Sequence, residues 1–414
     1  MKQLKPFLFA LFALASVFSA FKIYENEHII RSYKSDTIEL SHVEYGLLNV
    51  ATWENLLADV MVSKLQNYES TETDTIGMKK SVGALLTTLI DDYEKVVQEK
   101  NKGGLFGSMK NSLYASAFKD IKNDIPMLTN KVMAFLDVKN NNEGIKKFIV
   151  LELQKYSKGS FSKTDFSKVN SIIKKYDGKS LVETKEIIAK KARAKQATNN
   201  LFILIVSVAF LSISLLLVFV KSISKFEYSL TILFSFLLLF LGVSLPMIEI
   251  DARISEINFT FLEETISFKN QVLFYKSKSI YEVVTLMMGQ NKFDLMVVGA
   301  LIFLFSVLFP VFKLLSTCLY VISSQLKKNK IIQFFIFKTG KWSMADVFVI
   351  AIIMAFIAFE GIISEQLNQL NSVADSVDIL TTNNSSILFG FYAFTAFVIL
   401  SLLLSQKIHN SLSK

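Results

Sequence analysis

The sequence predicts an all-α integral membrane protein with six transmembrane helices, a helical extracytoplasmic domain and a small extracytoplasmic β element between spans 3 and 4. Composition is the first observation behind this prediction, since 51% of the 414 residues are hydrophobic, phenylalanine occurs 37 times and proline only four times. The second observation is a set of apolar runs, most of them about 18 residues or longer, which is the length that a helix needs to cross a bilayer.

The predicted spans occupy six hydrophobic segments: Pro6–Phe21, Leu201–Val220, Tyr228–Ile248, Leu295–Tyr320, Ala345–Ile363 and Ile387–Leu404. The first segment follows Lys2 and Lys5, so a cleaved signal peptide is the alternative to an anchor. Its cleavage region is poor, because Phe18-Ser-Ala20 places a bulky side chain where a small one is needed. We expect residues 1–22 to form an uncleaved signal anchor, and either interpretation sends the next domain across the membrane.

The short loops set the predicted orientation, because Lys and Arg are enriched on the cytoplasmic side of membranes. Four basic segments fall on one side of a six-span arrangement: Lys2 with Lys5, Lys221 with Lys225, the lysines from Lys327 to Lys341, and Lys407 with Lys414. A basic run from Lys185 to Lys195 falls on the other side, but long domains cross largely regardless of charge. Both termini are therefore predicted to be cytoplasmic and residues 23–199 extracytoplasmic. The net charge of +9 then reflects topology, and nothing indicates nucleic acid.

Residues 23–199 show helical periodicity throughout. Apolar residues recur at helical spacing between Trp53 and Leu65, between Val82 and Val97, and after Pro126, which suits a first helical turn. Asp177-Gly178 ends a helix, and from Ser180 the pattern runs directly into the span at residues 200–220. We expect a packed helical bundle, within which the pattern points to no ligand site.

The stretch between the third and fourth spans has a different pattern of apolar and charged residues. Isoleucine and phenylalanine alternate imperfectly with charged residues from Ile248 to Tyr275, which indicates strands, and a helix is predicted over Ser279–Met288. Residues 376–386, with a turn at Asn383-Asn384, are expected to add an edge strand. The prediction is a small extracytoplasmic sheet that rests on the membrane helices.

Two segments of the membrane region contain specific sequence motifs. Ser306-Val-Leu-Phe-Pro-Val-Phe-Lys313 and Trp342-Ser-Met-Ala-Asp-Val-Phe348 resemble the two signature segments of the paraquat-inducible protein A family, which includes lipophilic envelope-spanning tunnel protein A. Leu245-Pro246-Met247 and Gly390-Phe-Tyr-Ala-Phe394 are similar to the family's first-span proline and last-span aromatic start. The resemblance covers a single four-span unit at about residues 228–407, which leaves 408–414 as a cytoplasmic tail.

The resemblance implies a multi-pass protein of the bacterial inner membrane. It also implies an inner-membrane subunit of an envelope lipid-transport system, acting with membrane lipids and a mammalian-cell-entry-type lipid-transfer protein. Two features depart from the family pattern. Many members carry two copies of the unit and zinc ribbons with paired cysteines, whereas here there is one copy and Cys318 is the single cysteine. The helical outer domain is the second departure.

Charged and polar residues inside the predicted spans are the candidate functional residues, because a charge at membrane depth is costly and is usually paired or functional. The candidate network is Lys313, Asp346, Glu360 and Thr395. Lys313 could instead snorkel to the interface, and Asp346 could cap a helix start. An ion pair between the two would serve either structure or function. The family motifs also contribute four residues with an expected structural role: Pro246, Pro310, Trp342 and Ser343.

Enzyme chemistry finds little support in the sequence. None of the three histidines has a metal-ligand spacing, and no phosphate loop, nucleophile elbow or cysteine pair is present. We therefore expect no catalytic residues, no metal and no cofactor.

Besides lipid transport, the alternative function is a membrane sensor or scaffold whose helical outer domain reads a ligand or docks a partner. The short cytoplasmic segments, which hold no recognisable output domain, weigh against the sensor.

Overall fold

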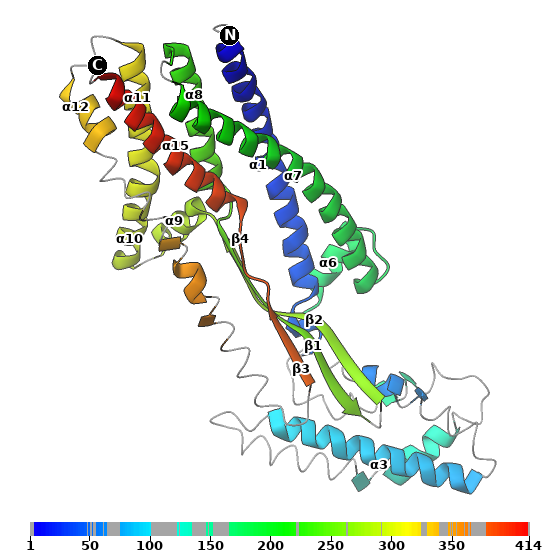
Figure 1. Ribbon diagram of the computed structural model, residues 1–414. Helices are drawn as coiled ribbons and strands as arrows, with labels where there is room; N and C mark the ends of the chain where they lie inside the picture. The colour runs from blue at the N-terminus through cyan, green and yellow to red at the C-terminus, as the bar shows by residue number, and fades with distance from the viewer. Residues whose placement is uncertain are drawn as a thin grey trace.

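The computed structural model describes most of the chain. The described residues are 4–47, 49, 52, 55–60, 62–63, 75–100, 122–123, 125–134, 146–147, 149–151, 165–220, 223–261, 264–290, 292–323, 329–338, 347, 349, 351–352, 354–359, 361–362, 365 and 378–412. Within them the molecule is mostly helical, with one antiparallel sheet. Helices gather at one end, where both chain termini lie, and the sheet runs from them toward α3 at the other end (Figure 1).

The elements follow one another in this order: α1 (Leu4–Leu40), η1 (Val43–Tyr45), α3 (Thr75–Lys100), α6 (Ser167–Lys175), α7 (Leu181–Phe219), α8 (Lys225–Ser244), β1 (Ile248–Phe261), β2 (Glu264–Lys278), α9 (Ile280–Met288), α10 (Phe293–Phe303), η2 (Leu304–Leu308), α11 (Phe309–Ile322), α12 (Lys330–Gln333), η4 (Phe334–Lys338), β3 (Asp378–Asn383), β4 (Ser386–Ile387) and α15 (Phe389–Leu412). The short elements η2 and η4 are π-helical, and η1 is a 3₁₀ turn.

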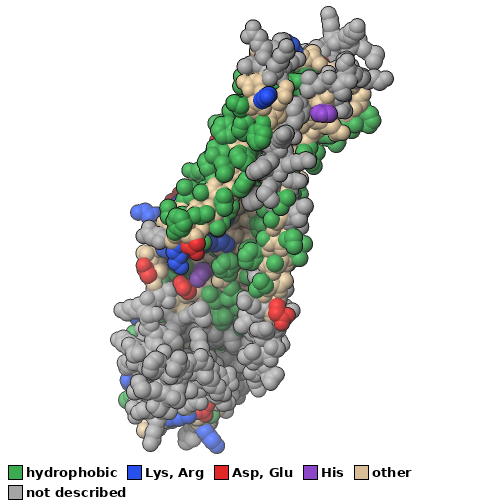
Figure 2. Space-filling view, turned by 90° about the vertical axis from the view of Figure 1, so that its left-hand side faces the viewer, with side chains coloured by type: hydrophobic (Ala, Val, Ile, Leu, Met, Phe, Trp, Pro, Cys, Tyr) green, Lys and Arg blue, Asp and Glu red, His purple; other side chains and the backbone are tan. Residues whose placement is uncertain are grey.

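Among the described residues, four helices are long and apolar enough to cross a membrane: Leu181–Phe219, Lys225–Ser244, Phe293–Ile322 and Phe389–His409. They correspond to four of the six predicted spans and define a multi-pass membrane protein. Figure 2 shows hydrophobic side chains covering this helical part of the molecule, with charged side chains gathered below it. Of the other two predicted spans, Pro6–Phe21 lies within α1, and Ala345–Ile363 falls partly outside the described residues. Six spans are therefore not established.

Two helices are continuous through the predicted domain boundaries. α1 runs unbroken past residue 22, and α7 begins after Ser180, whose side chain accepts a hydrogen bond from the Glu183 N–H, and runs past residue 199. The two lie side by side (Figure 1), and their apolar residues share a core with α8, α11 and α15. The prediction of one helix from Ser180 into the span is confirmed. Two helices thus connect the membrane region rigidly to what lies outside it.

The third predicted span ends earlier than expected. α8 ends at Ser244, whereas the prediction extended it to Ile248, which lies in β1. Pro246 follows directly and has no N–H to continue the helical hydrogen bonding. The Pro246 carbonyl instead accepts a 3.2 Å hydrogen bond from the Gly390 N–H at the start of α15. A Cβ on Gly390 would lie 2.4 Å from the Leu245 carbonyl oxygen, so this close approach requires glycine.

The sheet has the strand order β2-β1-β3, all antiparallel, and β4 pairs with the start of β1. The register between β1 and β2 shifts between Ala252 and Arg253, and that between β1 and β3 shifts between Ile254 and Glu256. β3 is the predicted edge strand, and Asn383 turns the chain by accepting hydrogen bonds from Ser385. The predicted helix Ser279–Met288 is also confirmed, with Ser279 as its N-cap.

The predicted small sheet is confirmed, and it also contacts helices outside the membrane region. β1 contains 14 residues, which corresponds to roughly 45 Å of extended chain. The far end of the β1–β2 hairpin forms part of a second core. There Ile254 and Ile257 of β1, with Ile266 and Phe268 of β2, pack against helical residues such as Val82 and Val132. The sheet therefore connects the membrane helices to the outer helical domain. The helical periodicity of that domain is seen directly in the described turns of α3.

Candidate functional site

The end of the sheet nearest the membrane, here called the root, presents two chemically different faces. One face carries cross-strand partners that are isoleucines and lysines: Ile248 with Lys278, and Ile250 with Lys276. The other face carries partners with carboxylate and hydroxyl groups: Glu249 with Ser277, and Asp251 with Tyr275. Because side chains alternate between the faces of a strand, the sequence alternation separates the carboxylates from the lysines. Each face then meets a different helix.

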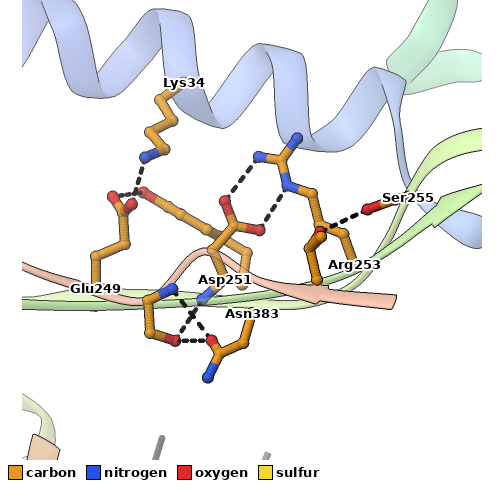
Figure 3. Close-up of polar contacts among 9 residues, drawn as sticks. Lys34, Glu249, Asp251, Arg253, Ser255 and Asn383 are labelled. Carbon is orange, nitrogen blue, oxygen red and sulfur yellow. Dashed lines mark hydrogen bonds and ion pairs between the residues drawn. The ribbon is translucent and has the colours of Figure 1, made fainter. Parts of the chain in front are cut away.

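The carboxylate face packs against α1 and forms an ion-pair cluster (Figure 3). Glu249 is 3% exposed, and its carboxylate pairs with the Lys34 ammonium from α1. The Tyr275 hydroxyl donates a 3.0 Å hydrogen bond to the other carboxylate oxygen of Glu249. Burial, and next the Glu249 charge, raise the pKa of Tyr275 above its ordinary value, so the phenol stays protonated and donates. The buried carboxylate is thus compensated by one cation and one hydrogen bond.

Asp251 is compensated by a residue of its own strand. The Arg253 guanidinium donates two hydrogen bonds to the Asp251 carboxylate, each 2.7 Å long. These bonds raise the pKa of Arg253 further above its ordinary value, so the arginine is charged at any accessible pH. A bidentate arginine–carboxylate pair fixes both side chains in one orientation. The pair lies beside the strand irregularity at Ala252 and Arg253, on the face of β1 that is turned toward α1 (Figure 3).

A second contact joins α1 to the first turn of α9. Arg31 donates hydrogen bonds of 2.5 and 3.0 Å to the Glu282 carboxylate, and one of 2.9 Å to the Ser277 carbonyl. Glu282 also accepts the Ser279 N–H, which completes the capping box of α9. Burial alone would raise the pKa of Glu282, but the bonds from Arg31 and Ser279 outweigh it and hold that pKa below the ordinary value.

Glu27 forms a contact between α1 and α7. The Asn199 amide of α7 donates a 2.6 Å hydrogen bond to the Glu27 carboxylate. Burial is the main influence on Glu27, and together with the Glu249 charge it raises the pKa of the carboxyl group despite that hydrogen bond. The ionised form of Glu27 is therefore disfavoured in the folded protein, in contrast to Glu282.

The isoleucine and lysine face of the root borders an apolar cavity of about 240 Å³, here called the root cavity. Its lining consists of Met247, Ile248, Ile250, Lys276, Lys278, Ser279, Ile280, Val283, Ile302, Ile352 and Phe359. These residues come from the end of α8, the sheet, α9, α10 and the segment that follows the second signature. Apart from Ser279 and the two lysines, every lining side chain is hydrophobic. The cavity can therefore hold an apolar group close to a positive charge.

The structure places only part of the predicted network. Lys313 lies in α11 inside the helical core and is 5% exposed, and its carbonyl accepts a 2.7 Å hydrogen bond from the Thr317 hydroxyl. The Thr395 hydroxyl donates to the carbonyl of Phe391, one turn earlier in its own helix. The partners Asp346 and Glu360 lie outside the described residues. The proposed pairing of Lys313 with Asp346 therefore stays a prediction.

The four motif residues also divide between described and undescribed parts. Pro246 immediately follows the end of α8, and Pro310 occupies the first turn of α11, directly after the π-helical turn η2. The wide π turn and the proline together interrupt the regular hydrogen bonding of this span just before Lys313. Trp342 and Ser343 lie outside the described residues.

Sequence reasoning missed the residues of the root. The alternation that predicted strands also separates Glu249 and Asp251 from Ile248 and Ile250, and that signal could have identified a face with buried charge. Their partner Lys34 on α1 could not be found in this way, because 215 positions separate it from Glu249. The cavity likewise combines segments that are distant in the sequence.

The fold and the root together define a class: a multi-pass membrane protein whose sheet ends in an apolar cavity among membrane helices. Within it, residues 269–368 match the model of the family described as paraquat-inducible protein A. The matched segment contains both signature segments and runs from β2 to beyond the fifth predicted span, so it is shorter than the 228–407 unit expected from the motifs. No curated protein and no solved structure matches the chain.

Proposed function

We propose that this chain is an inner-membrane subunit of a bacterial envelope lipid-transport system, acting with a mammalian-cell-entry-type lipid-transfer protein. The root cavity is the observation that carries the proposal. It lies where the membrane helices meet the sheet, and its hydrophobic lining suits an acyl chain. The family match supports the same function, because it covers most of the residues that line the cavity.

The position of the cavity suits a lipid that leaves or enters the membrane. Met247 follows the end of α8, while Ile302 lies roughly 13 Å along α10 from Phe293, so the lining reaches from the end of one membrane helix to the interior of another. Burial of apolar surface contributes about 25 cal/mol for each Å² removed from water. An acyl chain outside the bilayer therefore gains substantially from such a cavity, as transfer to a partner protein requires.

Filling the cavity tests this function. Val283→Trp places a large side chain into the cavity from α9, and we expect it to reduce the phospholipid that co-purifies with the protein by roughly half or more. Phospholipid would be extracted from detergent-purified full-length protein and quantified by mass spectrometry. Val297→Trp is the matched control, because Val297 is 39% exposed on α10 and does not line the cavity. Equal lipid content in the two variants would contradict the proposal.

The alternative, a membrane sensor or scaffold, is favoured by a different observation. The sheet shares one core with the outer helices at its far end, and at its root Arg31 of α1 donates hydrogen bonds both to the Ser277 carbonyl of β2 and to Glu282 of α9. Such a connection could carry a ligand-induced movement of the outer domain to the membrane helices. This function requires no lipid in the cavity. It predicts that Val283→Trp and the native protein carry the same lipid, so the experiment above also discriminates between the two functions.

A further inference from the structure

We infer that the root cavity takes the apolar end of a lipid with an anionic headgroup, and that Lys276 and Lys278 bind that headgroup. The inference rests on the proposed function and deepens it, because it names the class of lipid. Three features of the cavity support it: its size, the charges at its border, and its position relative to the membrane. Each is independent of the family match.

Size limits what the cavity can enclose. Pockets that bury a drug-sized ligand measure about 300–1,000 Å³, and the root cavity measures about 240 Å³. A complete phospholipid with two acyl chains therefore does not fit inside. A part of one chain does, which leaves the headgroup outside the apolar lining. The residues at the border of the cavity then decide which headgroup is favoured.

The charges at that border are positive. Lys276 and Lys278 lie on the same face of β2, directly across from Ile250 and Ile248, and both line the cavity. Within the described part of the chain, neither ammonium group is engaged in an ion pair. A lysine ammonium is a compact charge with three donors, and it is a common ligand of phosphate groups.

The nearby carboxylates do not neutralise these lysines. Glu249 and Asp251 point to the opposite face of the strand, where Lys34 and Arg253 compensate them. Glu282 is close enough for the Lys278 charge to lower its pKa, but its hydrogen bonds come from Arg31 and Ser279. Alternation along the strand thus leaves a positive border on the face that meets the cavity.

Position favours a headgroup over a free anion. The lysines lie at the end of the sheet that joins the membrane helices, while the hydrophobic lining continues toward Ile302 in α10. A lipid at the membrane surface places its phosphate at this level and its chain below it. Long lysine side chains reach such an interface while their stems cover apolar surface.

The test compares headgroups at constant chain composition. Full-length protein would be reconstituted with equal amounts of phosphatidylglycerol and phosphatidylethanolamine carrying the same acyl chains, and bound lipid would be measured by native mass spectrometry. We expect the native protein to be enriched in phosphatidylglycerol. Each Lys→Gln substitution, at Lys276 or Lys278, should lower the enrichment roughly fivefold, the effect of one basic residue near an anionic surface.

Two control variants keep the inference falsifiable. Lys269→Gln removes the same charge from the same strand, but Lys269 pairs with Glu256 away from the cavity, so it should leave the enrichment unchanged. Lys276→Arg with Lys278→Arg keeps the charge and should retain the enrichment, which excludes misfolding as the cause of a loss. An equal effect of Lys269→Gln and Lys276→Gln would overturn the inference.

The outcome also separates this inference from the proposed function. If the double Lys→Gln variant binds both lipids as the native protein does, while Val283→Trp still reduces total lipid, the headgroup inference fails and lipid binding stands. If Val283→Trp leaves total lipid unchanged, the proposed function fails with it. Thermal stability of each variant in detergent, compared with the native protein, verifies that the fold is intact.

Discussion

Individual ionisable residues at the root differ in what their charge does for stability. Glu27 and Glu282 are both carboxylates on or against α1, yet the pKa of Glu27 is raised, mainly by burial, and that of Glu282 is lowered by its hydrogen bonds against the effect of burial. A group whose pKa is raised by folding destabilises the folded state when it ionises, and a group whose pKa is lowered stabilises it. The two residues therefore give opposite pH dependences.

Glu27 provides a direct test of this difference. Because its folded pKa lies above the ordinary value of 4.5, its contribution to stability falls as pH rises from 4.5 through the raised pKa. Glu27→Gln keeps an oxygen that accepts the Asn199 hydrogen bond and removes the charge. We expect the unfolding temperature at pH 7 to rise by roughly 2 °C, the scale of about 1 kcal/mol in a large domain. A scan of unfolding temperature against pH provides the measurement, and a lower value at pH 7 would refute the argument.

Helices and strands were predicted with different success, for physical reasons. α7 and α9 could be predicted because local signals suffice: Ser180 and Ser279 cap their first turns, and apolar periodicity follows. The small sheet could be predicted from the alternation along its strands, but its shared core with the outer helices could not, because those helices lie far away in the sequence. Arg31 could not be assigned a role, since 251 positions separate it from Glu282.

The ion pair between Arg31 and Glu282 is expected to couple α1 to α9. Both side chains are 29% exposed, so solvent reduces but does not abolish the interaction, and we expect a coupling energy of roughly 1 kcal/mol. A double-mutant cycle with Arg31→Gln and Glu282→Gln, followed by unfolding in detergent, measures it. The side-chain amide that Glu282→Gln introduces still has an oxygen to accept the Ser279 N–H, so the cap is retained. The coupling should disappear as pH falls through the lowered pKa of Glu282, below about 4.5.

Another pair on α1 serves as the control for this cycle. Lys22 and Glu25 form an exposed pair 2.8 Å apart within the same helix, with side chains 35% and 43% exposed. Surface pairs of this kind contribute little. A cycle on Lys22 and Glu25 should give no measurable coupling. If both cycles give the same coupling energy, the pair of Arg31 and Glu282 contributes no more than an ordinary surface ion pair, and the proposed coupling of α1 to α9 is wrong.

At the scale of the whole molecule, the two chain termini lie at the same end (Figure 1), which the predicted orientation requires, while the orientation itself stays a prediction. Both ends of the chain lie at the helical end, opposite α3 (Figure 1). Basic residues at that end, including Lys330 and Lys407, are typical of a cytoplasmic side. The proposed orientation places the sheet, the root cavity and residues 23–199 outside the cytoplasm, where a transfer protein would receive a lipid.

Labelling of single cysteines tests that orientation. After Cys318→Ala, a cysteine in place of Ser171, an exposed residue of α6, should react with an impermeant thiol reagent in intact spheroplasts. A cysteine at Asn329, which precedes α12, should react only after the membrane is opened. If only Asn329→Cys were labelled in intact spheroplasts, the predicted topology would be wrong and the opposite orientation would hold. It would also place the root cavity on the cytoplasmic side.

The shared core at the far end of the sheet has a consequence for biosynthesis. Helical residues such as Leu57, Val82 and Val132 emerge from the ribosome long before Ile266 and Phe268, which complete their core. α7 and α8 are synthesised in between. We therefore expect this core to be completed only after α7 and α8 have been synthesised and the β1–β2 hairpin has followed. Insertion of α7 and α8 into the membrane is then expected to precede completion of this core, whose apolar residues stay uncovered until the hairpin has been synthesised.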